Sequence, residues 1–383
     1  MMKKLAILIA LSFFINSFGQ QYSKKWADIN YAGDAKNYHL MDIYLPKAVK
    51  TSYPVVVYIY GSAWYSNSSK GADMNTIGKA LLDAGYAVVT PNHRSSSDTL
   101  YPGQINDIKA VIRFVRGNAA TYSLDTAFIG ISGSSSGGHL AALAATSVGV
   151  KKFTVDSTTM NIEGNVGKYN TFSSKVHAAC DWFGPTDLLK MDSCRGSSMY
   201  AEGQSPEETL IGGTKKALRN KFVMLSPTTY IDSTDCPFLI FHGDADNVVP
   251  YCESELLYNA LQLYGVQSEY VRVPGGQHYT GTHTDANIKK MVDFFNKISK
   301  NNISAVIALN NTVKTYVANN TLTIEGISDF SVYQYEIIDI SGKKLRSNAF
   351  TTSKIDIASL KNGVYFFKLQ SKDGNSMIDK FVK

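Results

Sequence analysis

The fold is decided by the stretch Gly133-Ser134-Ser135-Ser136-Gly137, which has the pattern G-x-S-x-G. An apolar, strand-like run precedes it, and a helix-like run rich in Ala and Leu follows it. In that setting the pattern is typical of a nucleophile elbow, a sharp turn that lifts one serine hydroxyl out of the carboxyl edge of a sheet. Only Ser135 has glycine two residues before and two residues after it, so we expect Ser135 to be the nucleophile rather than Ser134 or Ser136. A flexible Gly/Ser linker is the alternative, but a linker would not separate a strand from a helix.

Outward from this turn, strand-like and helix-like runs alternate from residue 22 to about residue 299. That alternation predicts an α/β fold with a mostly parallel sheet covered by helices on both faces. The expected strands are 54–60, 86–91, 127–132, 176–181, 238–242 and 269–273, and the expected helices are 104–118, 138–145, 253–264 and 285–300. Two long polar segments, 151–175 and 188–218, interrupt the pattern, and we expect the second to overhang the site as a lid.

The composition changes near residue 301, where Thr, Val, Ile, Asn and Tyr become frequent and turn signals separate short alternating runs. This pattern predicts a small all-β domain, a sandwich, at the C-terminal end. The expected organisation is a signal peptide over 1–19, a catalytic domain over 20–300, a linker over 301–312 and the β domain over 313–383.

The first residues favour export. Lys3 and Lys4 precede an apolar run over residues 5–15, as in a secretory signal, and that run is too short to span a bilayer. We therefore expect an exported mature chain without an integral membrane segment. Most of the formal net charge of +6 lies in the signal segment and in the tail 314–383, so the middle of the chain is almost neutral and has no basic stripe, which argues against a nucleic-acid partner.

The chain has 4 cysteines, namely Cys180, Cys194, Cys236 and Cys252. Export permits disulfides, and an even count is compatible with two bridges, but the sequence leaves their number and pairing open. No CxxC or HxxxH spacing occurs, so metal binding is the weaker alternative. No metal or cofactor is expected.

A serine hydroxyl becomes a good nucleophile only when a histidine accepts its proton and a carboxylate orients that histidine. The strand 238–242 leads into a loop that carries Asp244 and Asp246. We expect Asp246 to be the orienting acid, because the loop must extend past the strand end to face the histidine. Asp244 is expected to be a turn residue that hydrogen-bonds its own backbone. His278 follows the last strand directly and is the expected base, whereas His283 is expected at the surface.

The oxyanion that forms during acyl transfer needs backbone N–H donors. One donor is expected from Ser136, directly after the nucleophile. The others are expected from Ser62 and Ala63, in the loop Tyr60-Gly61-Ser62-Ala63-Trp64 that follows the strand 54–60.

Two tryptophans are expected to bind substrate, Trp64 in this loop and Trp182 at the end of the strand 176–181. Trp64 could form a wall for an aromatic or sugar ring, and core packing is the alternative role for this side chain.

Residues 39–300 resemble bacterial esterases of the feruloyl and acetyl-xylan type, which have the α/β-hydrolase fold and are related to the hormone-sensitive-lipase-like carboxylesterases. The matching pieces are Met41–Pro46, Tyr101–Ala110, Ile112–Phe114, Gly133–Ala141, Asp181–Asp187, Leu225–Pro227, and His242-Gly243 with Asp246, Val249 and Pro250. The resemblance implies that Ser135, Asp246 and His278 are nucleophile, acid and base. One departure stands out, because the usual oxyanion motif His-Gly-Gly-Gly-Trp is replaced by the sequence of residues 60–64. The added Cβ atoms narrow the conformations open to this loop.

The tail, residues 331–383, resembles the C-terminal sorting domain of the type IX secretion system of Bacteroidetes. The matching pieces are Ile337–Lys343, Leu360–Leu369 and Lys380–Lys383. The resemblance implies transport across the outer membrane by the type IX machinery, followed by removal of the tail or attachment to the cell surface. A carbohydrate-binding module is the competing interpretation.

These observations together predict a secreted serine carboxylesterase that forms an acyl-enzyme and hydrolyses acetyl or feruloyl esters. The expected substrate is an acylated plant polysaccharide or a small ester. One alternative is a peptidase related to prolyl oligopeptidase, although the chain has no room for the N-terminal propeller of those enzymes. The other is a glycan-binding surface protein with impaired catalysis.

Overall fold

The computed structural model describes residues 21–327, 329–339, 343–371 and 376–383 of the 383-residue chain. The expected signal peptide lies outside the described residues. Across the described part of the chain, no helix combines the length and apolar character needed to cross a bilayer.

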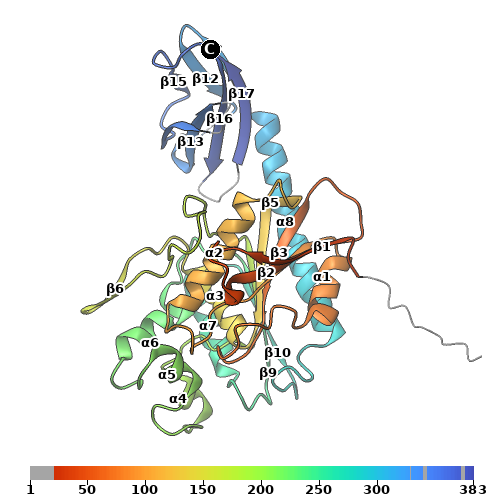
Figure 1. The fold of residues 1–383 in the computed structure, drawn as a ribbon, viewed down its shortest axis with the longest axis vertical. Helices are drawn as coiled ribbons and strands as arrows, with labels where there is room; N and C mark the ends of the chain where they lie inside the picture. The colour runs from red at the N-terminus through yellow and green to blue at the C-terminus, as the bar shows by residue number, and fades with distance from the viewer. Residues whose placement is uncertain (1–20, 328, 340–342, 372–375) are drawn as a thin grey trace, which may run out of the picture.

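An eight-stranded sheet forms the centre of the larger part of the protein (Figure 1), with the strand order β1-β2-β4-β3-β5-β8-β9-β10. The strands are β1 (Lys24–Asn30), β2 (Leu40–Leu45), β3 (Tyr53–Ile59), β4 (Ala87–Pro91), β5 (Leu124–Ser134), β8 (Ala178–Trp182), β9 (Phe238–Gly243) and β10 (Ser268–Val273). The pairs from β4 to β10 are parallel, and β2 runs antiparallel to both β1 and β4. The six expected strands are confirmed. The antiparallel strands β1 and β2 were not among them.

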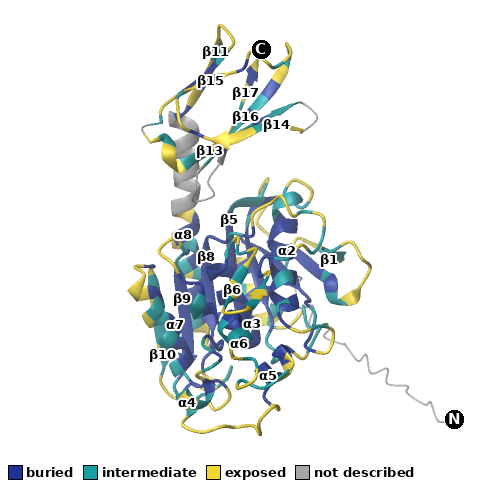
Figure 2. Ribbon diagram, turned by 90° about the vertical axis from the view of Figure 1, so that its left-hand side faces the viewer, coloured by how far each residue is buried: buried dark blue, intermediate teal, exposed yellow. Residues whose placement is uncertain are grey.

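The helices cover both faces of this sheet, as expected. They are α1 (Lys79–Asp83), α2 (Gly103–Gly117), α3 (Ser136–Thr146), α7 (Cys252–Leu263) and α8 (Asp285–Thr312). Alternate residues of β3 enter two different cores, because side chains alternate across a strand. Val55 and Val57 pack in the core that contains residues of α2, α3 and α7, whereas Val56 packs in the core that contains residues of α1 and α8. The central strands of the sheet are accordingly buried, with covered side chains on both faces (Figure 2).

Helix α8 corrects the expected boundary between the two parts. It begins at Asp285 as predicted but continues to Thr312, through the stretch 301–312 that was expected to be a linker. The apolar residues Ile303, Val306 and Ile307 recur at helical spacing in this stretch. The change in composition at residue 301 therefore marks a change in sequence character and not the end of the helix.

The two polar segments form additions to the sheet. The first contains the hairpin β6 (Phe153–Val155) and β7 (Thr158–Met160), and the second contains α4 (Met191–Arg195) and α5 (Pro206–Ile211), followed by α6 (Arg219–Leu225). Glu163 anchors the first segment to α2, because its buried carboxylate lies 2.6 Å from Arg113 Nη1 and 3.1 Å from Lys109 Nζ.

The C-terminal part consists of two antiparallel sheets, with the orders β11-β12-β15 and β14-β13-β16-β17. The strands are β11 (Lys314–Ala318), β12 (Thr321–Glu325), β13 (Tyr333–Asp339), β14 (Lys344–Ala349), β15 (Lys354–Asp356), β16 (Val364–Ser371) and β17 (Ser376–Val382). Leu322 of one sheet and Phe367 of the other share a single hydrophobic core, as in a sandwich. Figure 1 shows this part at the far end of α8, which confirms the expected all-β domain.

Candidate active site

The turn between β5 and α3 carries Ser135 at the carboxyl edge of the sheet. Ser135 has φ 57° and ψ −124°, an unusual backbone conformation for a residue other than glycine. Its two flanking glycines make the turn possible by close packing. A Cβ atom on Gly133 would lie 2.3 Å from the carbonyl oxygen of Gly137, and one on Gly137 would lie 2.2 Å from that of Ile59. The side chain of Ser135 is thereby placed at the surface of the elbow, where the residue is 8% exposed.

The structure brings the expected base and acid to this serine. His278 Nε2 lies 3.0 Å from Ser135 Oγ, and His278 Nδ1 lies 2.7 Å from Asp246 Oδ2. The acid follows β9 and the base follows β10, two adjacent parallel strands whose carboxyl ends meet at one edge. The two loops also contact each other, since Ala245 N–H donates to the carbonyl oxygen of Gly276 at 2.9 Å.

Asp246 is held as a buried, ionised carboxylate. Burial alone would raise its pKa, but hydrogen bonds from His242 and His278 outweigh that effect and hold the pKa well below its usual range. Its second oxygen, Oδ1, accepts the N–H groups of Val248 and Val249 at 2.8 and 3.0 Å. An ionised carboxylate can only accept, so His278 Nδ1 carries the proton of this bond, and in the neutral imidazole Nε2 then presents a lone pair to Ser135.

The loop that follows β3 approaches the elbow from the other side. Ala63 and Trp64 both have positive φ, at 49° and 60°, so the loop adopts a tight left-handed path although it lacks the second and third glycines. The N–H group of Ser62 donates to the side-chain oxygen of Ser136 at 2.9 Å. The expected Ser62 donor is therefore engaged by a side chain, which corrects the expectation of a free N–H group at this position.

The part of the chain that contains Ser135 matches a known protein family. Residues 41–261 match the family BD-FAE. The chain belongs to the BD-FAE family of α/β-hydrolase esterases. The residues matched run from β2 to α7 and include Ser135 and Asp246, while His278 lies beyond them.

Relatives of the BD-FAE domain are esterases by name. Esterase LipQ of Mycobacterium tuberculosis is 28% identical over 263 residues, which cover 68% of this chain and 58% of LipQ. A bifunctional GH43-CE protein from Bacteroides eggerthii is 50% identical with a TM-score of 0.69, covering 72% of this chain and 35% of that one. A truncated form of a carbohydrate esterase from gut microbiota is 44% identical with a TM-score of 0.71, covering 73% of this chain and 98% of that one. The chain thus spans less than two thirds of LipQ and of the GH43-CE protein.

The tail matches a second family. Residues 318–383 match the secretion system C-terminal sorting domain. This match indicates export by type IX secretion to the cell surface or the extracellular space.

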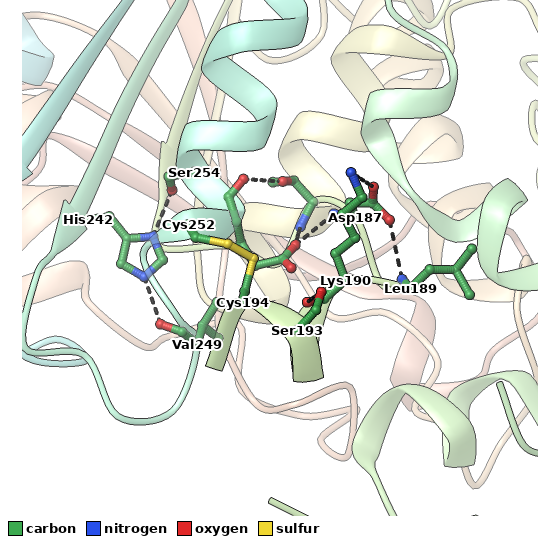
Figure 3. The surroundings of a disulfide bond; sticks show 11 residues. Asp187, Leu189, Lys190, Ser193, Cys194, His242, Val249, Cys252 and Ser254 are labelled. Atoms are coloured by element: carbon green, nitrogen blue, oxygen red, sulfur yellow. Dashed lines mark hydrogen bonds and ion pairs between the residues drawn. A yellow bond between two sulfur atoms is a disulfide. The ribbon is translucent and has the colours of Figure 1, made fainter. Parts of the chain in front are cut away.

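A disulfide joins α4 to the start of α7, the helix that follows the loop carrying Asp246 (Figure 3). Cys194 of α4 is bonded to Cys252 at the start of α7, 58 residues later, and the remaining cysteines, Cys180 and Cys236, are free and buried. Beside this bond, His242 contacts Ser254 Oγ at 2.7 Å and the carbonyl oxygen of Val249 at 2.9 Å. These contacts fix the loop whose N–H groups hold Asp246.

We predict that removing this disulfide destabilises the BD-FAE domain. A double replacement, Cys194→Ser with Cys252→Ser, is expected to lower the free energy of unfolding by about 2–4 kcal/mol, because the bond closes a long loop in the unfolded chain. The midpoint of urea unfolding measures this effect. Dithiothreitol should shift the wild-type midpoint to that of the double variant and leave the variant unchanged. An equal midpoint for all four samples would contradict a stabilising role.

Asp244 and His283, the alternatives to Asp246 and His278, contact other groups. Asp244 accepts the N–H group of Gly275 at 2.7 Å, so it ties its turn to the next loop, whereas a bond to the backbone of its own turn was expected. His283, which was expected at the surface, is half-buried. Its Nε2 lies 3.1 Å from Ser134 Oγ, and burial lowers its pKa to about 4.

Ser134 and His283 form a second serine–histidine pair, next to the pair formed by Ser135 and His278. Ser134 Oγ is also 2.8 Å from the hydroxyl of Tyr58, which donates to Asp73 Oδ2 at 2.6 Å. Ser134 is fully buried, so its hydroxyl has no access to a substrate. We assign this chain of hydrogen bonds a supporting role beneath the elbow. Nothing in the sequence links Tyr58 and Asp73 to it, because they come from different elements.

Trp64 and Trp182 do not form the expected substrate wall. Trp64 is 3% exposed and packs edge-on against His139 at 5.1 Å, while Trp182 is 0% exposed and stacks on Phe241 at 4.1 Å. Both are core residues that support the elbow. The neighbouring aromatic residue Tyr65, in contrast, is 51% exposed.

The described residues contain no group of three or more His, Cys, Asp or Glu side chains arranged to hold a metal ion.

Proposed function

We propose that this chain is a secreted serine carboxylesterase with Ser135 as nucleophile, His278 as general base and acid, and Asp246 as the orienting carboxylate. The observation that carries the proposal is the position of His278, which lies within hydrogen-bond distance of both Ser135 Oγ and Asp246 Oδ2. The chain order of serine, aspartate and histidine is the one found in α/β-hydrolases.

In the first half of the proposed reaction, Ser135 Oγ attacks the ester carbonyl while His278 Nε2 takes the hydroxyl proton. The carbonyl electron pair moves to the oxygen, and the tetrahedral intermediate then collapses as the bond to the leaving alcohol breaks. His278 gives its proton to that alcohol. Asp246 stays ionised throughout, because its lowered pKa favours the charged form that stabilises the imidazolium.

In the second half, water replaces the alcohol. His278 takes a proton from the water as its oxygen attacks the acyl-enzyme, and then returns the proton to Ser135 Oγ as the carboxylic acid leaves. No other group has to change its protonation state, so the three residues suffice for both halves.

We further propose that the ester is an acetyl or feruloyl group on a plant polysaccharide. Support comes from the two similar structures described as a carbohydrate esterase and a GH43-CE protein. Export by the type IX system is consistent with a polymeric substrate outside the cell. Tyr65 directly follows residues 60–64, the loop expected to supply oxyanion donors and called the oxyanion loop below, and the residue is 51% exposed, which offers a surface on which a sugar or feruloyl ring can stack.

Hydrolysis of para-nitrophenyl acetate, acetylated xylan and methyl ferulate by the wild-type protein tests the proposal, with Ser135→Ala as the blank. We expect release of acetate from the xylan or of ferulate from its methyl ester, and no release above background by the variant. Turnover of para-nitrophenyl acetate alone would retain the esterase and remove the polysaccharide. No turnover of any of the three would contradict the esterase itself.

A further inference from the structure

The side chain of Ser136 lies where the oxyanion loop meets the elbow. Its Oγ accepts the N–H group of Ser62 at 2.9 Å, and the residue is only 2% exposed. Ser136 is also the first residue of α3, an 11-residue helix. Its own backbone N–H group therefore has no partner within the helix and points out of the N-terminal end. Both polar groups of one residue thus face the junction at which the oxyanion is expected to form.

The hydroxyl of Ser136 still has a hydrogen to donate. A serine hydroxyl is one donor and two acceptor positions, and the bond from Ser62 uses only an acceptor position. Among the residues that the structure describes, this hydroxyl accepts the bond from Ser62 and donates no hydrogen bond of its own. A buried donor without an acceptor costs free energy, so the hydrogen is available to a group that enters with the substrate.

One expected donor of residues 60–64 is engaged at the same place. The N–H group of Ser62 donates to Ser136 Oγ and is therefore not directly available to a substrate oxygen. The acceptor of this bond, the Ser136 hydroxyl, carries a hydrogen of its own. Each bond in a chain of hydrogen bonds polarises the next, so the Ser62 N–H group strengthens Ser136 as a donor.

We propose that Ser136 is a further catalytic residue, whose Oγ–H donates to the oxyanion and passes on the polarisation of the Ser62 N–H group. The inference rests on the proposed esterase function. When the Ser135 Oγ–carbon bond forms and the carbonyl pair moves to oxygen, the Ser136 hydroxyl rotates onto that oxygen and neither gains nor loses a proton. A donor to a full negative charge is stronger than one to a neutral carbonyl, so this contact favours the transition state over the bound ester.

The test is Ser136→Ala, with para-nitrophenyl acetate as substrate. We expect kcat to fall about 10- to 100-fold while KM changes less than about threefold, because the lost contact exists mainly in the transition state. The loss is smaller than for removal of a whole donor, since the Ser62 N–H group is released. A reversible boronic acid inhibitor, which forms a tetrahedral adduct on the nucleophile, should bind more weakly by about the same factor.

Two further variants separate this role from a structural one. Ser147→Ala makes the same change at the C-terminal end of α3, where the hydroxyl bonds to the carbonyl oxygen of Leu143, and should leave kcat and inhibitor affinity unchanged. Ser136→Thr keeps a hydroxyl on Cβ and should retain more activity than Ser136→Ala. If Ser136→Ala keeps a third or more of the wild-type kcat, the inference is overturned and the released Ser62 N–H group is sufficient. Absence of wild-type activity on any ester would instead refute the proposed function.

Discussion

Ser135→Ala is expected to lower kcat by about 10⁶-fold, the largest loss of any single substitution in this chain. The variant removes the atom that would form the acyl-enzyme, so binding of the ester and the oxyanion donors would remain without a covalent route. Alanine at this position keeps a Cβ atom, and the positive φ of 57° is already tolerated with one. The fold should therefore persist, and thermal unfolding of the variant should match that of the wild type.

Ser134→Ala is the matched control, because Ser134 also stands beside a histidine. An alkyl fluorophosphonate forms a covalent bond to an activated serine, which mass spectrometry detects as an adduct on a peptide. We expect the adduct in the wild type and in Ser134→Ala and none in Ser135→Ala. An adduct that persists in Ser135→Ala and disappears in Ser134→Ala would assign the nucleophile to the buried pair Ser134–His283.

Asp246→Asn is expected to lower kcat by about 10⁴-fold with little change in KM. The amide can donate to His278 Nδ1, which stabilises the tautomer whose proton is on Nε2, and that tautomer cannot accept the Ser135 proton. The amide also has no charge with which to stabilise the imidazolium. Its remaining oxygen can still accept the N–H groups of Val248 and Val249, so the loop should keep its shape.

The control for this variant is Asp244→Asn, which lies two residues earlier in the same loop. Asp244 contacts the backbone of Gly275 and has Arg272 at 3.5 Å, and neither contact involves the imidazole. Its replacement should change kcat by less than about tenfold through small shifts of the two loops. A larger loss for Asp244→Asn than for Asp246→Asn would exchange the two assignments.

The elbow and its neighbours could be predicted from the sequence because their determinants are local. Gly133 and Gly137 are required by contacts within a few residues of Ser135 and with β3, so the pattern itself records the geometry. Asp246 and His278 could be selected for a related reason. Each follows a strand at the same sheet edge, and chain order with distance past the strand end is enough to rank them above Asp244 and His283.

The errors arise where the outcome depends on the direction of a side chain or on distant contacts. Trp64 and Trp182 lie in loops and strand ends near the site, but the rings turn inward onto His139 and Phe241, which sequence position does not reveal. The bond between the Ser62 N–H group and Ser136 joins residues 74 positions apart. The pairing of Cys194 with Cys252 is likewise a property of how α4 packs beside α7, and the sequence offered no way to choose it.

Helix α8 connects the loop that carries His278 to the sorting domain. It begins two residues after His283, beside the catalytic loop, and its 28 residues extend for about 42 Å before the sorting domain starts. The loop that carries His278 and the sorting domain are therefore joined to opposite ends of one continuous helix. A rigid helical connection transmits any force or rotation applied to the sorting domain to the sheet edge at which Ser135 lies, which a flexible linker of the same length would not do.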